Sequence, residues 1–121
     1  MRNHLKSLYT KVRKHLLTQG VRSTYTNKYD VDTCAYRSKE GHLSCAVGCL
    51  IKDEYYNVTL ESHAADYTDV VYAVQQSLGY KGLSSKDVDL LIRLQGIHDN
   101  RKPDTWKVHL DKVAEEFGIT Q

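Results

Sequence analysis

Residues 45–51 read Cys-Ala-Val-Gly-Cys-Leu-Ile, an almost wholly apolar run near the middle of a chain of 121 residues. A run of this composition is expected in the interior of a fold. It could be the end of a β-strand or a short helix that begins after Ser44, because so short a run has no periodicity that separates the two. In either case it predicts that the centre of the chain packs into the core.

The residues before this run predict a β-hairpin. Residues 33–37 and residues 42–47 are both compatible with β-strands, and they flank a polar connection that ends at Gly41. A glycine in this place supports a backbone with positive φ, which hairpin connections commonly require. We therefore expect a hairpin and a buried cysteine-rich segment across residues 33–51, with residues 21–32 forming a loop or an irregular edge.

The N-terminal part of the chain predicts a basic amphipathic helix over residues 3–19. Its apolar residues recur at three- and four-residue steps, which places them on one face: Leu5, Leu8, Val12 and Leu16. Arg2, Lys6 and Arg13 fall within a narrow arc beside that face at 100° per residue. Gly20 follows in the position that commonly ends a helix.

Three further helices are expected across residues 69–119. The first spans residues 69–78 and ends at Gly79. The second begins at Ser84, with Asp87 completing a short capping box, and is expected to end at Gly96, with one apolar face formed by Val88, Leu91, Ile92 and Gln95. The third follows Pro103 and ends at Gly118, and its stripe consists of Trp106, Leu110, Val113, Ala114 and Phe117.

Length and composition indicate a single folded domain over residues 1–121. Hydrophobic residues make up 40% of the chain, charged residues 26%, and there is one proline. This balance excludes disordered and collagen-like chains. No apolar run approaches the roughly 20 residues that span a bilayer, and Met1 is not followed by the apolar segment of a secretory signal. We expect a mainly helical α+β domain in the cytoplasm, with no membrane segment.

Charge is distributed unevenly along the chain. Seven of the 17 basic residues lie within residues 1–29, which contain none of the 15 acidic residues. The rest of the chain therefore has ten basic and fifteen acidic side chains, a balance of −5. A cationic N-terminal part attracts phosphate backbones, acidic partner surfaces or the acidic part of the same chain.

The three cysteines allow three interpretations. They could bind zinc together with an imidazole, although paired Cys-x2–4-Cys spacing is absent. Cys45 could be a nucleophile in the first turn of a helix, with His42 or the pair His98 and Asp99 as its base. The interpretation we favour is that all three thiols are buried packing residues, so that the chain has no metal, no cofactor and no catalytic residue. The cysteines and the candidate ligands are Cys34, Cys45, Cys49, His42, His63 and His98.

Arg37 follows a strand-like run close to the cysteines. An arginine near a core usually needs a carboxylate partner, so we expect it to pair with Asp53 or Asp99. Alternatively, it lines a small cleft with His98 and Asp99. The segment from His98 to Arg101 is expected to form a polar turn between two helices, and Asp87 is expected to face solvent.

Several of these stretches resemble a family of small uncharacterised proteins of bacteriophages and bacterial genomes. The resemblance covers residues 5–119 and rests on Cys34-Ala-Tyr-Arg37, Gly41, the run at residues 45–51, Leu94-Gln-Gly-Ile-His-Asp99 and Trp106 with Leu110 and Ala114. Lys52 stands where a proline is expected in this family. The family has no established activity, so the resemblance implies a phage or prophage origin and no catalytic role.

We expect a small phage-encoded protein that binds a host protein stoichiometrically and inhibits or modulates it, for example in counter-defence. Arginine and tyrosine are enriched at interface hot spots, so the candidate contacts are Arg2, Lys6, Arg13, Lys14, Tyr25, Tyr29, Tyr55 and Tyr56. The alternatives are a nucleic-acid-binding accessory protein that uses the basic helix, and a cysteine-dependent enzyme or small-ligand binder.

Overall fold

The computed structural model describes residues 3–26, 28–30, 32–38 and 42–120. Its helices are α1 (Leu5–Gln19), α2 (Thr68–Leu78), α3 (Ser85–Asn100) and α4 (Trp106–Glu116). Its strands are β1 (Thr24–Thr26) and β2 (Asp32–Cys34), and four 3₁₀ turns complete it: η1 (Gly48–Leu50), η2 (Asp53–Tyr55), η3 (Val58–Leu60) and η4 (Pro103–Thr105). The prediction of a mainly helical α+β fold is confirmed.

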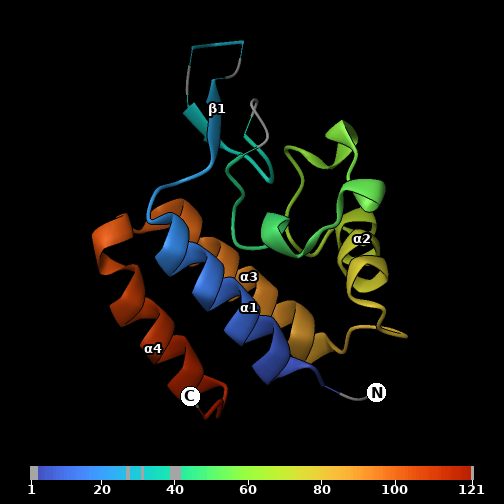
Figure 1. Ribbon diagram of the computed structural model, residues 1–121, viewed down its shortest axis with the longest axis vertical. Helices are drawn as coiled ribbons and strands as arrows, with labels where there is room; N and C mark the ends of the chain where they lie inside the picture. Colours follow the sequence, from blue (N-terminus) through green and yellow to red (C-terminus); the bar gives the residue numbers. More distant parts are fainter. Residues whose placement is uncertain (1–2, 27, 31, 39–41, 121) are drawn as a thin grey trace.

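Helices α1, α3 and α4 pack against one another and supply a large part of the core (Figure 1), to which α2 and the segment around η1 also contribute buried side chains. α1 and α3 run in the same direction, and α4 returns antiparallel to both. Their contact faces carry fully buried leucines together with Trp106, whose indole N–H donates to the carbonyl of Arg101 at 3.1 Å. Burying such side chains stabilises the fold by roughly 1.5–3 kcal/mol each.

The starts of α1 and α3 are joined through Asp87. This side chain is fully buried and accepts hydrogen bonds from the backbone N–H groups of His4, at 2.7 Å, and Ser84, at 3.0 Å. The Ser84 hydroxyl accepts in turn from the Asp87 N–H, which confirms the predicted capping box. The expectation that Asp87 faces solvent is wrong, because the carboxylate satisfies an N–H group that lies 83 residues away in the sequence.

The basic helix α1 buries the predicted stripe at Leu8, Val12 and Leu16, and Tyr9 is buried beside them. The Tyr9 hydroxyl donates to the carbonyl of Leu110 on α4 at 2.9 Å. On the same side, Arg13 pairs with Asp111 of α4 at 2.8 Å. Part of the positive charge of the N-terminal region is therefore neutralised within the chain itself.

Helix α3 differs from its prediction in length and in its buried face. It continues through Gly96 to Asn100, so residues 98–100 form its last turn instead of a loop. Its buried residues are Asp87, Leu90, Leu91, Leu94, Ile97 and His98, whereas Ile92 is exposed. The buried face of α3 is wider than the predicted face and is rotated about the helix axis relative to it. The reason is that α3 contacts α1 on one side and α4 on the other.

The hairpin lies earlier in the chain than predicted. β1 and β2 pair antiparallel, with Thr24 opposite Cys34 and Tyr25 opposite Thr33. In the part of the chain that is described, residues 33–47 contribute only one isolated bridge between their two halves, from Arg37 to Ser44. Other N–H groups of this region bond to side chains from elsewhere: that of Tyr36 to Glu61, and that of Ser44 to Gln19. The expected role of Gly41 lies outside the described residues.

The cysteine-rich run folds into a turn followed by η1, so its helical alternative holds, although the helix begins at Gly48 and Ser44 does not cap it. Gly48 is required there, because a Cβ atom would lie 2.0 Å from the carbonyl oxygen of Tyr36. The run is buried against α1 and α2, as predicted for the interior. In the described part of the chain, no helix combines the length and apolarity needed to cross a membrane.

Candidate partner-binding groove

His98 belongs to a buried polar cluster at the end of α3. Its side chain is fully buried, and its Nε2 atom lies 3.0 Å from the backbone nitrogen of Ser23. A backbone N–H can only donate, so Nε2 accepts and the imidazole proton is on Nδ1. That proton is donated to Asp99 across 2.8 Å. Both ring nitrogens are therefore occupied by bonds within the fold.

Asp99 also accepts hydrogen bonds from Gln95 and from the thiol of Cys34. Burial alone would raise the pKa of the Asp99 carboxyl, and the bonds from His98, Cys34 and Gln95 outweigh it and hold the pKa below its usual value. Burial and the same carboxylate raise the pKa of Cys34 to about 12. The cluster thus joins the start of β1, the end of β2 and the end of α3.

This cluster is the one group of metal-binding side chains found among the described residues, with ligand atoms within 4.8 Å of one another. A metal on Nδ1 of His98 would require the proton to move to Nε2, where it would face the N–H of Ser23. The cluster therefore fits a hydrogen-bonded lock better than a metal site. The zinc site considered for all three cysteines is not assembled in this part of the chain.

The remaining cysteines are also placed as packing residues. Cys45 is buried, its sulfur accepts from the N–H of Gly48 at 3.3 Å, and burial raises the pKa of its thiol strongly. The thiol of Cys49 donates to the carbonyl of Ala46, and burial raises its pKa to about 12. A nucleophile needs a thiolate and an adjacent base, so this arrangement favours inert thiols.

Arg37 is held by three contacts. Its guanidinium pairs with Asp53 at 2.6 Å, donates to the carbonyl of Ile51 at 2.8 Å and lies 4.5 Å from the ring centre of Tyr56. Of the two expected carboxylate partners, Asp53 is the one that pairs with it. The expected cleft of Arg37 with His98 and Asp99 is not formed, because Arg37 and Asp99 line different hollows.

The hollow lined by Arg37 is an open groove of about 1110 Å³ between β1 and the η3 segment. We call it the tyrosine groove, and it is lined by Thr24, Tyr25, Thr26, Arg37, Ser38, Leu43, Tyr56, Val58, Glu61 and Ser62. The Tyr25 hydroxyl and the Ser62 hydroxyl lie 2.9 Å apart, so one hydrogen bond joins its two sides. Val58 is 73% exposed at its edge.

Glu61 fixes the shape of the tyrosine groove. Its carboxylate accepts from the backbone N–H groups of Tyr36, at 2.9 Å, and Arg37, at 3.1 Å, and from the Tyr56 hydroxyl at 2.5 Å. Burial and this carboxylate together raise the pKa of Tyr56 strongly. Glu61 therefore holds one groove side chain, that of Tyr56, and the backbone of Tyr36 and Arg37 in one arrangement.

The residues predicted to contact a partner do not form one surface. Tyr25 and Tyr56 line the tyrosine groove, and Tyr29 and Tyr55 are exposed outside its lining. Lys6 and Lys14 are exposed on α1, Arg13 is engaged by Asp111, and Arg2 lies outside the described residues. The groove residues Leu43, Val58, Glu61 and Ser62 were not predicted, since each is an isolated residue with no spacing that marks it.

Comparisons with known proteins give no assignment: no protein-family model, no curated protein and no solved structure matches this chain.

Proposed function

We propose that this protein is a small phage-encoded binding protein that acts in the host cytoplasm. It binds one host protein stoichiometrically through the tyrosine groove and thereby inhibits or modulates it. The observation that carries the proposal is that the groove combines Tyr25, Tyr56 and Arg37 in a fixed arrangement. The family resemblance of the sequence supports the phage origin.

The composition of the tyrosine groove suits a protein partner. Tyrosine and arginine dominate interface hot spots because they combine a large apolar area with directional hydrogen bonding. Leu43 and Val58 add apolar surface beside them. At 73% exposure, Val58 leaves most of its side chain to be buried by a partner. The polar groups of such a site are hydrated in the free protein, and its apolar groups contribute binding free energy when a partner covers them.

The groove is also prepared for binding before a partner arrives. Association is weakened when interface side chains must lose rotational freedom, by roughly 0.5–1.5 kcal/mol for each flexible side chain. Here Arg37 is fixed by Asp53, Ile51 and Tyr56, and Tyr56 is fixed by Glu61. These side chains therefore lose little further rotational freedom when a partner binds.

Binding of nucleic acid through α1 is supported less well. Lys6, Lys11 and Lys14 are exposed on this helix, but Arg13 is paired with Asp111. A complex that depends on phosphate contacts would weaken steeply as the salt concentration rises. A complex anchored in the tyrosine groove would change little over the same range.

Photocrosslinking in host cells tests the proposal. A photoreactive phenylalanine analogue is placed at position 58 in the groove and, as a matched control, at position 108 on α4, since Val108 is also exposed, at 56%. We expect one discrete protein adduct from position 58 that disappears with Tyr25→Ala, and no such adduct from position 108. The partner identified in this way should bind in a 1:1 ratio.

With that partner purified, titration calorimetry compares Val58→Asp with Val108→Asp. The first should weaken binding at least about tenfold, because the complex would bury an unpaired carboxylate, and the second should leave it unchanged. Equal crosslinking from both positions, adducts with nucleic acid alone, or equal effects of the two substitutions would contradict the proposal.

A further inference from the structure

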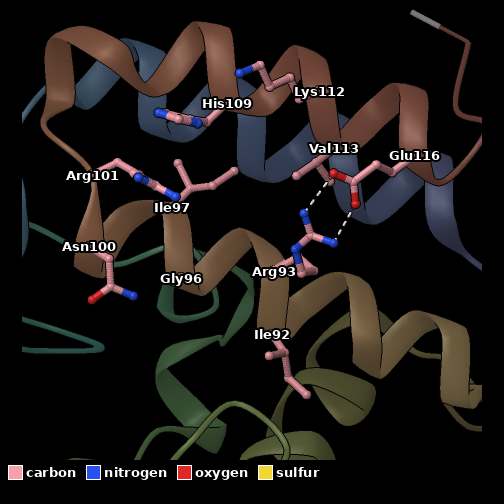
Figure 2. A pocket seen from close by; sticks show the side chains of 10 residues that line it. All are labelled: Ile92, Arg93, Gly96, Ile97, Asn100, Arg101, His109, Lys112, Val113 and Glu116. Atoms are coloured by element: carbon pink, nitrogen blue, oxygen red, sulfur yellow. Dashed lines mark hydrogen bonds and ion pairs between the residues drawn. The ribbon is translucent and has the colours of Figure 1, made fainter.

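A second hollow lies between α3 and α4, on a different part of the molecule from the tyrosine groove. Figure 2 shows this cationic groove, which has a volume of about 380 Å³ and whose base is formed by Gly96, Ile97 and Val113. The charged side chains around it are Arg93, Arg101, His109, Lys112 and Glu116.

The two ends of the cationic groove differ in charge. At one end, Arg93 donates two hydrogen bonds to Glu116, at 2.5 and 2.9 Å, so these charges cancel. At the other end is Arg101, and Lys112 lies on α4 between His109 and Glu116 (Figure 2); the described residues supply no ion-pair partner for either cation. The groove therefore has a neutral end and an end with surplus positive charge.

The pKa of His109 reflects the same surplus of positive charge. Partial desolvation and repulsion from Arg101 and Lys112 lower the pKa of its imidazole. A cation at the C-terminal end of a helix is favourable in itself, which gives Arg101 a structural reason for its position. Lys112 lies within α4, where that reason does not apply.

Gly96 is the second independent feature of this groove. It lies inside α3, where glycine is less favourable than alanine. Its φ is not positive, and an added Cβ atom would meet nothing closer than Asn100 Nδ2, at 3.9 Å. Neither the backbone nor the packing of this chain requires glycine here. Its missing side chain leaves the helix surface bare in the groove, where the atoms of a bound group can approach closely.

We propose that the cationic groove binds a small organic phosphate monoester. The phosphate group lies at Arg101 and Lys112 with His109 beside them, and the organic part lies on Ile97 and Val113 over Gly96. Arginine and lysine are the residues that bind phosphate most strongly. The volume is within the range of about 300–1,000 Å³ that is usual for small-ligand sites. At the opposite end Arg93 is already paired with Glu116, so that end supplies no free cation for a second anion and one phosphate group is preferred.

Two-dimensional NMR titrations test this proposal with defined probes: adenosine 5′-monophosphate, adenosine and inorganic phosphate. We expect the monophosphate to shift the amides of Gly96 and Lys112 and the ring protons of His109 in a saturable way. Phosphate should shift only the His109 end, at higher concentration, and adenosine should shift neither. The ring protons of His109 should also titrate at a higher pH when the monophosphate is bound, because the anion offsets the repulsion from Arg101 and Lys112.

Matched substitutions separate a built site from general surface charge. Lys112→Gln should weaken binding of the monophosphate at least about tenfold, since it removes a charge-assisted hydrogen bond. Lys107→Gln changes the net charge equally on the same helix but outside the groove lining, and it should have no effect. Gly96→Leu should abolish binding while leaving the melting temperature unchanged or higher.

Three results would overturn the proposal. The first is the absence of saturable shifts in the groove with the monophosphate. The second is an equal effect of Lys112→Gln and Lys107→Gln. The third is tight binding of a single-stranded oligonucleotide at these residues without binding of the monoester. None of these measurements depends on the tyrosine groove. Their failure would therefore not affect the proposed function, which the crosslinking and calorimetry experiments test separately.

Discussion

The three packed helices and the irregular segment formed by residues 35–38 and 42–67 are stabilised in different ways. α1, α3 and α4 satisfy their own backbone hydrogen bonds and are joined by apolar stripes. The backbone bonds of the irregular segment are mostly those of short turns, and several of its other N–H groups bond to side chains that are distant in sequence. Glu61 accepts from residues 36 and 37, Gln95 accepts from Val47, and Ser77 accepts from Lys52.

This difference shows how an irregular surface can be as fixed as a helix. A buried backbone N–H that loses its acceptor is unfavourable by about 1–3 kcal/mol. Each side-chain acceptor that bonds to an N–H group of the irregular segment therefore stabilises one specific path of the chain. The tyrosine groove lies on this segment, and the cationic groove lies on the helices.

The largest expected effect is at a glycine of the irregular segment. Gly48→Ala places a Cβ atom 2.0 Å from the carbonyl oxygen of Tyr36, which is backbone and cannot rotate away. We expect the free energy of unfolding in urea to fall by about 3 kcal/mol or more. Gly96→Ala in α3 is the matched control and should raise it by up to about 1 kcal/mol. The comparison between the two regions fails if both substitutions are neutral.

Glu61→Ala should have the next largest effect. It leaves the N–H groups of Tyr36 and Arg37 and the hydroxyl of Tyr56 without their acceptor. We expect a loss of about 3 kcal/mol in the free energy of unfolding. Glu116→Ala removes an exposed carboxylate that pairs with Arg93 and should change stability little. Similar losses for both glutamates, measured by urea unfolding, would show that Glu61 has no special role.

Acid should weaken the buried cluster around Asp99 in a defined pH range. The folded pKa of Asp99 lies below its ordinary value of 3.8, because the hydrogen bonds to the carboxylate outweigh its burial. The unfolded chain therefore binds the proton first. The stability that the ionised carboxylate supplies is complete above about pH 4 and is lost as the pH falls through the folded pKa.

Asp99→Asn tests this range, because asparagine cannot ionise. The variant should be less stable than the natural protein at neutral pH, and the difference should become smaller as the pH falls below about 4. Asp104→Asn, at an exposed position, serves as the control and should show no such change. A constant difference between Asp99→Asn and the natural protein down to acid pH would mean that the cluster does not stabilise the charge of Asp99.

The smallest expected effect is on thiol chemistry. Cys45 is buried and its pKa is strongly raised, so iodoacetamide at neutral pH should not modify it until the protein is unfolded. Peptide mass spectrometry with and without denaturant measures this. Rapid modification of folded protein at Cys45 would restore the interpretation of this residue as a nucleophile.

The helices could be predicted because their information is local. The stripe at Leu8, Val12 and Leu16 and the capping box of Ser84 with Asp87 follow from spacing alone. The end of α3 was predicted too early, at Gly96. The local sequence does not distinguish a glycine inside a helix from a glycine that ends one. The burial of Asp87 was missed because its partner, the N–H of His4, is distant in sequence.

The irregular segment was predicted poorly for the same reason. The bond from Glu61 to residues 36 and 37 spans about 25 positions and replaces the strand pairing expected there. β1 consists of Thr24, Tyr25 and Thr26 within a polar region that reads as a loop. Of the candidate site, Tyr25, Arg37 and Tyr56 were identified by residue type, but their meeting in one groove depends on tertiary contacts.

Amide hydrogen exchange of the free protein measures most directly whether the tyrosine groove is fixed before it binds. The N–H groups of Tyr36 and Arg37, which bond to Glu61, should exchange nearly as slowly as the central amides of α3, and Glu61→Ala should release them selectively. Exchange of these two amides close to the rate of an unstructured chain would contradict the account, because the groove would then have no permanent shape.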